Sequence, residues 1–292
     1  MEKHNIMRHC RLFNTVSEFN EAYNGEQYEE PWVSVTDGDG NGRVDYNKPN
    51  SLAIPFTIEM LENGSIYTYI SYPISYSLNG GVWVSLNEGD ELDVSLSSGD
   101  TISFKGNSGI TFSQTITGAC NVYGNVMSLV CGDNFATATT IPQDARFETL
   151  LANTSVISAE DLLLPATTLT DYCYYQMFNV CTGLTAAPVL PATTLTVGCY
   201  NFMFMGCTSL TTAPELPATT LVQDCYNGMF YDCSSLNNIT CLATDISALD
   251  CTTEWVYGVS STGTFTKAAS MSSWTTGTSG IPSGWTVIDA SE

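Results

Sequence analysis

Apolar and polar residues alternate along several short segments in the first half of the chain. Ile54, Phe56 and Ile58 set the pattern, and similar runs follow up to about residue 112, separated by Asn-Gly and Gly-Asp pairs. A period of two places apolar side chains on one face of a β-strand. Short strands at this spacing, bounded by turn residues, predict a small β-sandwich over residues 49–145.

The pattern then changes to a repeat with a period of 26 residues. The motif L-P-A-T-T-L begins at Leu164, Leu190 and Leu216, and cysteine, Met-Phe and leucine positions recur in the same phase. A fixed period of this size is typical of stacked coils, each of which buries its apolar stripe against its neighbours. We therefore expect a stack over residues 146–258, closed by a C-terminal cap over residues 259–292.

Within each repeat, apolar residues are spaced by four. Leu195, Cys199, Met203 and Cys207 show the spacing, which would place them on one face of a helix. An extended segment with a proline, residues 210–216, follows. One helix and one short strand per repeat is leucine-rich-repeat geometry. The expected fold class is α+β and multi-part: a β-rich N-terminal sandwich followed by a leucine-rich-repeat solenoid with a C-terminal cap.

Other positions of the repeat vary between coils at a fixed phase. A repeat scaffold can carry specificity at such positions without disturbing its core. Aromatic rings and amides suit glycans, through apolar faces and hydrogen bonds, although plain solvent exposure explains these residues equally well. The candidate binding residues on the predicted helix side are Tyr175, Asn179, Asn201, Phe202, Asn227 and Tyr231.

Residues 1–48 are too short for a core of their own. They combine an arm with a Gly-rich hairpin, and they carry five of the eight Lys and Arg residues of the chain. Exposed apolar side chains on a short segment usually need a partner surface. We expect the arm to dock onto other structural proteins through Phe13, Phe19 and Trp32.

The hairpin turn has a second interpretation as a calcium loop. Asp37, Asp39, Asn41 and Asp45 occupy positions 1, 3, 5 and 9 of the loop pattern. Position 12, where a bidentate Glu should bind the ion, is Lys48, and strand-like sequence rather than helix precedes the loop. Calcium and an acidic turn without a metal remain the two alternatives, and no other cofactor is expected.

Charge limits the partners. The formal net charge is −22, and no Lys or Arg occurs between residues 147 and 266. Phosphate backbones need basic side chains, so nucleic-acid binding is not expected. The sequence contains neither a run of 18 apolar residues nor an apolar leader near Met1, so we expect neither membrane insertion nor secretion.

The sequence contains few candidate catalytic residues. The two histidines, His4 and His9, both lie in the arm, which removes Ser-His-Asp and Cys-His pairs from the rest of the chain. The acidic cluster between Glu88 and Asp93 could supply a glycosidase pair, but a turn between strands favours a solvated loop. The eleven cysteines, seven of them in two ladders, are expected to be mostly buried reduced thiols rather than disulfides. We expect no enzymatic activity.

The repeats carry a family resemblance. The pattern L-P-A-T-T-L…C-Y…M-F…C-T-S-L-T…A-P, over residues 147–259, resembles the BspA-like leucine-rich repeats of gut Bacteroidales and their phages. The tail T-G-T-F…W…G-I-P-S-G-W-T-V resembles the cap of such proteins, and S-L-N-G-G-V-W…S-G-D-T-I-S-F-K-G-N resembles the small β-domain often placed ahead of them. The stretches P-W-V-S-V and V-D-Y-N-K resemble the N-terminus of phage members.

The resemblance implies a structural virion protein of a Bacteroides-infecting, crAss-like phage. Such proteins are head or tail fibres or capsid decorations, made in the host cytoplasm, that display a repeat surface for adhesion to a host-surface glycan or protein. A homo-oligomer, trimer or dimer, is expected by the same analogy. The alternatives are a secreted bacterial surface adhesin and, less favoured, a polysaccharide-active enzyme.

Overall fold

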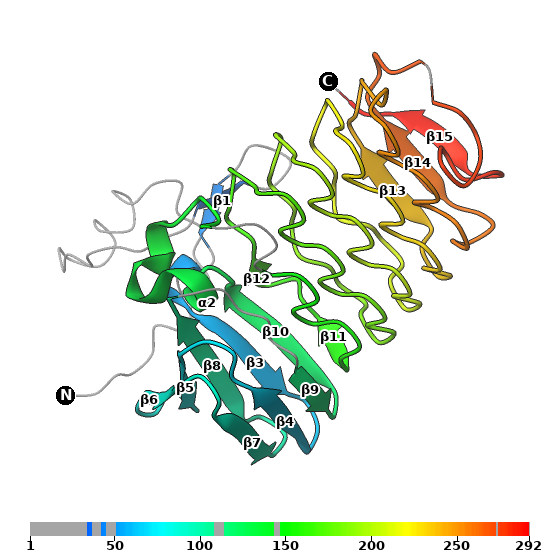
Figure 1. Ribbon diagram of the computed structural model, residues 1–292. Helices are drawn as coiled ribbons and strands as arrows, with labels where there is room; N and C mark the ends of the chain where they lie inside the picture. The colour runs from blue at the N-terminus through cyan, green and yellow to red at the C-terminus, as the bar shows by residue number, and fades with distance from the viewer. Residues whose placement is uncertain are drawn as a thin grey trace, which may run out of the picture.

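A computed structural model describes residues 34–36, 42–44, 51–107, 114–142, 147–272 and 274–291. Figure 1 shows a β-rich part near the N-terminus, then a row of stacked coils, and a small sheet at the C-terminal end. The docking residues Phe13, Phe19 and Trp32 lie outside the described residues. So do the calcium candidates, which are Asp37, Asp39, Asn41 and Asp45.

The β-rich part, residues 51–142 as far as they are described, holds two sheets. Strand order is β11-β10-β3-β8-β5-β6 in one sheet and β7-β4-β9 in the other. Phe56, Ile58 and Phe104 from the first sheet and Ile66 and Ile116 from the second belong to one buried cluster. The strands are β3 (Phe56–Met60), β4 (Gly64–Tyr69), β5 (Ile74–Leu78), β6 (Val84–Leu86), β7 (Glu91–Leu96), β8 (Thr101–Gly106), β9 (Gln114–Thr117) and β10 (Cys120–Asn125).

Strand β10 connects this part to the coils. It pairs antiparallel with β3 and parallel with β11 (Val156–Ser158) and β12 (Leu162–Leu163) of the first coil. The first coil is therefore hydrogen-bonded to a sheet edge instead of ending in solvent. Strand β1 (Ser34–Thr36) pairs antiparallel with β2 (Gly42–Val44) in a sheet of their own.

Residues 147–258 form the coil stack, in which backbone hydrogen bonds run between neighbouring coils. Every second N–H donates to a carbonyl of the next coil, as from Tyr174 to Cys199 at 3.0 Å and from Phe178 to Met203 at 2.9 Å. The intervening N–H groups donate three residues back, as from Met177 to Tyr174 at 3.2 Å. The backbone is thus a chain of turns whose polar groups are satisfied by the adjacent coil.

The expectation of an α+β fold with a helix in each repeat of a solenoid is wrong. The structure is 5% helical and 29% strand, and its sheets do not close into a solenoid. Every fourth residue of the turns has a left-handed φ, as at Tyr172 (57°), Gln176 (54°) and Val180 (59°), which an α-helix excludes. The helical segments described are α2 (Ser128–Cys131) and the 3₁₀ helices η2 (Ser51–Ala53) and η3 (Gly132–Thr137), all outside the coils.

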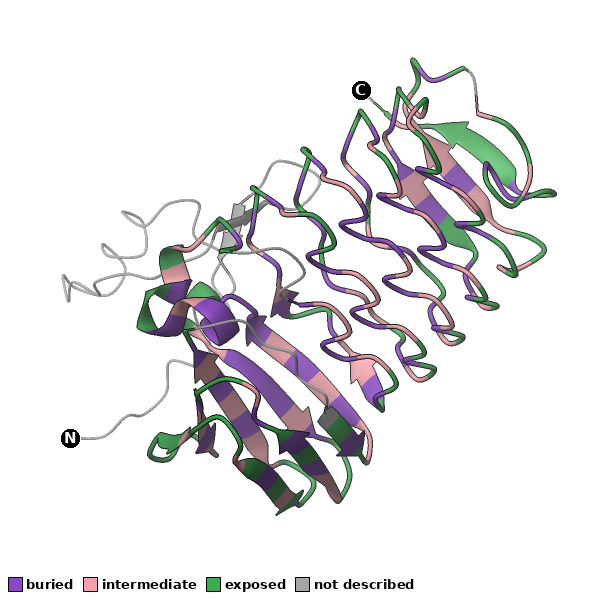
Figure 2. Ribbon diagram, viewed as in Figure 1, coloured by how far each residue is buried: buried purple, intermediate pink, exposed green. Residues whose placement is uncertain are grey.

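The interior of the coil stack consists of ladders of identical side chains. Ring centroids are 5.7 Å apart between Tyr174 and Tyr200, and 5.4 Å apart between Phe178 and Phe204. The predicted burial of the cysteine ladders is confirmed, and none of the described cysteines is in a disulfide. Burial raises the pKa of Cys225 to about 12. Figure 2 shows that buried and partly exposed residues alternate along each coil.

A three-stranded parallel sheet ends the chain. Its strands are β13 (Asn238–Cys241), β14 (Thr264–Lys267) and β15 (Thr286–Asp289), in that order. Trp274 stacks on Trp255 at 5.6 Å and meets Phe265 edge-on at 5.5 Å, so residues of the expected cap cover the last ring of the core. Strand β15 is the sheet edge, and all four of its residues are exposed.

The left-handed position of Val180 generates a stability prediction. A β-branched residue is strained there, and the equivalent residue of a later coil is Gly206, with φ of 74°. Val180→Gly should raise the free energy of unfolding by about 1 kcal/mol, because relief of strain outweighs the entropy cost of glycine. Denaturant titration measures the change.

Val189→Gly is the matched control. Val189 is 71% exposed and has no positive φ, so glycine relieves nothing there. We expect that substitution to lower the free energy of unfolding by about 0.5–1 kcal/mol. Equal losses of stability in the two variants would contradict the strained turn.

Candidate functional site

The outer face of the coil stack is built by the turns themselves. Two residues of each four-residue turn point inward and two point outward, as Met177 and Phe178 are buried while Tyr175 and Gln176 are half-exposed. We call the outward positions the turn face. In the second to fifth coils it comprises residues 171, 172, 175, 176, 179 and 180 and the residues 26, 52 and 78 positions later.

All six sequence-predicted binding residues lie on the turn face, although their exposure differs. Tyr175, Phe202 and Tyr231 are half-buried, as are Asn179 and Asn227. Asn201, which we expected on the same exposed surface, is buried and only 8% exposed. The turns hold these side chains at fixed backbone positions, because each is flanked by an inter-coil hydrogen bond.

Aromatic rings gather in two groups on this face. Tyr175 meets Tyr172 edge-on at 6.0 Å and Phe202 edge-on at 6.5 Å, so three rings from two coils are in contact. Tyr231 stacks on Tyr257 of the next coil at 4.7 Å. These distances and angles are those of favourable aromatic pairs.

Sequence reasoning missed two of these five rings. Tyr257 follows Tyr231 by 26 residues, so the repeat phase alone could have identified it. Tyr172 was harder to find, because it occupies a left-handed position that becomes glycine in the next coil.

Two glycines create the space that the rings occupy. A Cβ atom on Gly198 would lie 2.3 Å from Cε1 of Tyr172, and one on Gly228 would lie 2.0 Å from Cε1 of Phe202. Both glycines have a positive φ, of 60° and 58°. Each ring therefore lies directly against the backbone of the following coil, which restricts its motion before any ligand arrives.

The amides of the face supply polar groups. Nδ2 of Asn227 donates to Oδ1 of Asp224 at 3.1 Å. Among the described residues, nothing donates to Oδ1 of Asn179 or Asn201, and both oxygens are covered by neighbouring atoms. A buried acceptor without a donor costs free energy, so these two amides do not stabilise the coils.

Acidic side chains near the turn face raise the pKa of its tyrosines. Desolvation, and then the charge of Glu148, raise the pKa of Tyr175. Desolvation followed by the charges of Asp232, Tyr257 and Glu254 raises the pKa of Tyr231. Both phenols thus remain neutral hydrogen-bond donors at neutral pH. With no Lys or Arg between residues 147 and 266, the face repels anionic ligands.

The acidic cluster near Glu88 forms part of a turn. Oδ2 of Asp90 accepts a hydrogen bond of 2.7 Å from the N–H of Asn87, which closes the turn between β6 and β7. Burial, and then Glu91, raise the pKa of Tyr67 on the neighbouring strand. The part of the chain that the structure describes contains no group of three His, Cys, Asp or Glu residues suited to a metal, and no helix in it could span a membrane.

The glycine spaces generate a prediction. Gly206→Ala should lower the free energy of unfolding by about 1 kcal/mol, because its Cβ would meet only ordinary contacts at 3.5 Å and the cost is the left-handed φ. Gly228→Ala should cost about 2–4 kcal/mol, since it must also displace the Phe202 ring. Denaturant titration of both variants measures the difference.

Combination with Phe202→Ala identifies the source of that difference. In this background the two alanine substitutions should cost the same, because no ring remains to be displaced. An unchanged gap between them would show that Phe202 does not lie against Gly228.

Comparison with known proteins found nothing similar: no family model, no curated protein and no solved structure matches the chain.

Proposed function

We propose that this chain is a non-catalytic structural protein of a phage particle, and that its turn face binds a glycan on the host surface. The observation that carries the binding role is the set of rings held in contact across coils: Tyr172, Tyr175 and Phe202 in one group, and Tyr231 and Tyr257 in the other.

Glycan chemistry fits this face better than other ligands. Sugar rings present apolar C–H faces, which pack on aromatic rings, and hydroxyl groups, which both donate and accept hydrogen bonds. The face provides phenol donors, amide groups such as that of Asn227, and carboxylate acceptors such as Asp232. Because the surroundings are acidic, neutral sugars are favoured over acidic ones.

The rigidity of the coils supports a binding role. The face is fixed by hydrogen bonds between coils and by fully buried ladders such as Phe178, Phe204 and Phe230. A ligand that contacts both ring groups therefore meets a preformed surface, and little conformational entropy is lost on binding. Several weak contacts along an extended glycan can add to a useful affinity, particularly in an oligomer.

The placement on a phage particle rests on the family resemblance of the repeats and of the N-terminal stretch. A secreted adhesin of a bacterium would use the same face for the same ligand class. The two placements differ in where the protein is found, and that difference is measurable.

Combined substitution of the rings tests the binding role. Tyr175→Ala, Phe202→Ala and Tyr231→Ala together should weaken binding to host cells or purified host glycans by about tenfold or more, since each ring contributes about 0.5–1.5 kcal/mol. The control is Tyr67→Ala, Tyr69→Ala and Tyr72→Ala, three exposed tyrosines of the β-rich part. Unchanged binding by the first variant, with the fold intact, would end the assignment of this face.

Mass spectrometry of purified phage particles tests the placement. We expect the protein at a fixed copy number per particle, and absent from the same preparation when residues 1–48 are deleted. Recovery from washed bacterial surfaces, with none in particles, would instead establish the adhesin.

A further inference from the structure

A hollow lies on the β-rich part and shares no residue with the turn face. It has a volume of about 380 Å³ and is bounded by the β5–β6 hairpin, the end of β8 and the start of η3. The groups around it are an aromatic ring, an ion pair, hydroxyls and amides. The lining residues that matter here are Trp83, Ser85, Asn87, Lys105, Asn107 and Asp133.

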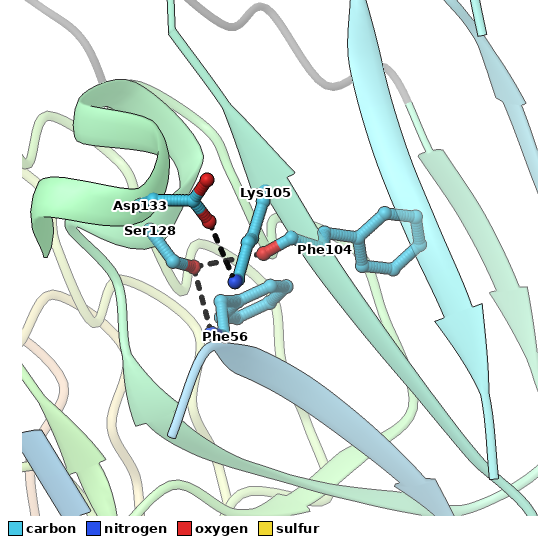
Figure 3. Close-up of polar contacts among 5 residues, drawn as sticks. All are labelled: Phe56, Phe104, Lys105, Ser128 and Asp133. Atoms are coloured by element: carbon cyan, nitrogen blue, oxygen red, sulfur yellow. Dashed lines mark hydrogen bonds and ion pairs between the residues drawn. The ribbon is translucent and has the colours of Figure 1, made fainter. Parts of the chain in front are cut away.

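Buried hydrogen bonds fix the strand that carries Lys105, which lines this hollow. Figure 3 shows Oγ of Ser128 accepting a hydrogen bond from the N–H of Phe56 and donating one to the carbonyl of Phe104, both at 2.8 Å. This side chain is fully buried and joins α2 to strands β3 and β8. Lys105 follows Phe104 directly, so its backbone position is fixed by the same bonds.

The Lys105 ammonium group is oriented by three neighbours. Its Nζ lies 2.8 Å from Oδ1 of Asp133, and it lies 4.8 Å from the ring centroid of Trp83 and 5.7 Å from that of Phe135. The hydrogen bond from Lys105, and then its charge, lower the pKa of Asp133. The Asp133 side chain is 89% exposed, and an exposed ion pair contributes little to stability.

Asn107 is positioned in a similar way. A Cβ atom on Gly132, whose φ is 50°, would lie 2.0 Å from Oδ1 of Asn107. Only glycine lets the amide approach the backbone of η3 this closely. An amide and an ion pair are therefore both fixed at the rim of the hollow.

Trp83 is partly exposed to solvent and does not belong to the buried core. It is 42% exposed and belongs to a run of three apolar residues, Val82 to Val84, at the edge of the sheet. An exposed tryptophan beside a hollow with convergent polar groups is typical of a ligand site. The core does not require this ring.

We propose that this hollow binds a neutral saccharide of one or two sugar rings. The Trp83 ring packs against the C–H face of the sugar. Lys105 donates to one hydroxyl and Asp133 accepts from its neighbour, which matches the donor and acceptor character of adjacent sugar hydroxyls. Ser85, Asn87 and Asn107 provide further polar groups at the rim.

Charge selects against an acidic sugar. Asp133 already neutralises the ammonium group of Lys105, and the net charge of the chain is −22. A carboxylate or sulfate would meet repulsion that the single lysine does not offset. The site does not depend on the turn face, so either proposal can fail without the other.

Titration of the full chain with small saccharides tests the proposal. Saturation-transfer NMR at millimolar concentrations should detect neutral mono- or disaccharides from a panel of hexoses and N-acetylhexosamines. Trp83→Ala should weaken that binding by about tenfold or more, and Lys105→Met by several-fold. Tyr72→Ala, which removes an exposed ring that does not line the hollow, should leave it unchanged.

The same titration in the turn-face triple variant separates the two sites. Binding that survives Tyr175→Ala, Phe202→Ala and Tyr231→Ala but not Trp83→Ala belongs to the hollow. Three results would overturn the proposal: no neutral sugar binds, only glucuronic or sialic acid binds, or binding persists unchanged in both Trp83→Ala and Lys105→Met. An unchanged denaturation midpoint establishes that each variant is folded.

Discussion

The hydrogen bonds between coils are the constraint from which the rest of this structure follows. Every second N–H of a turn segment, such as that of Tyr200 bonded to Cys225, has its acceptor in the next coil. A single coil would leave these groups unpaired next to its apolar interior, at a large cost in free energy. The coils therefore exist only as a stack, and its first member needs a partner, which β10 supplies through β11 and β12.

This constraint also explains the composition of the core. Neighbouring coils superimpose their side chains, so a shape that fits one coil must fit the next. Identical residues satisfy that condition, as in the stack of Tyr174, Tyr200 and Tyr226. Small thiols fill the gaps near the backbone, and Sγ of Cys207 donates to the carbonyl of Phe178 at 3.1 Å. A cysteine here is both a small apolar group and a weak donor to a carbonyl of the previous coil.

The repeat period could be read from the sequence, but the conformation of each repeat could not. A spacing of four residues fits a helix at first sight, and Leu195, Cys199 and Met203 follow it. At 3.6 residues per turn, however, each step of four rotates about 40° further, so a strict spacing of four leaves the helix face after a few steps. Glycines at 198 and 206, and aspartates at 224 and 232, were the second clue, because both residue types tolerate a left-handed φ.

The candidate binding residues could likewise be predicted only in part. Variation at a fixed phase identified Tyr175, Phe202 and Tyr231, because sequence alone shows which positions a ladder leaves free. The hollow beside Trp83 could not be predicted, since it joins residues from β6, β8 and η3 that only the folded sheet brings together. The burial of Asn201 could not be predicted either, because it depends on how the folded coils pack.

Two rings of the turn face lie at positions where the backbone is strained. Tyr172 and Phe202 adopt φ of 57° and 52°, at positions where the next coil has Gly198 and Gly228. A left-handed conformation costs a residue with a side chain about 1–2 kcal/mol, which glycine would avoid. Stability alone would therefore favour glycine at both positions. The left-handed φ recurs at every fourth residue of the turns, so the coil geometry imposes it whichever residue is present. At these two positions one coil carries a ring and the next coil carries the glycine against which that ring lies, so ring and glycine fit each other as a pair.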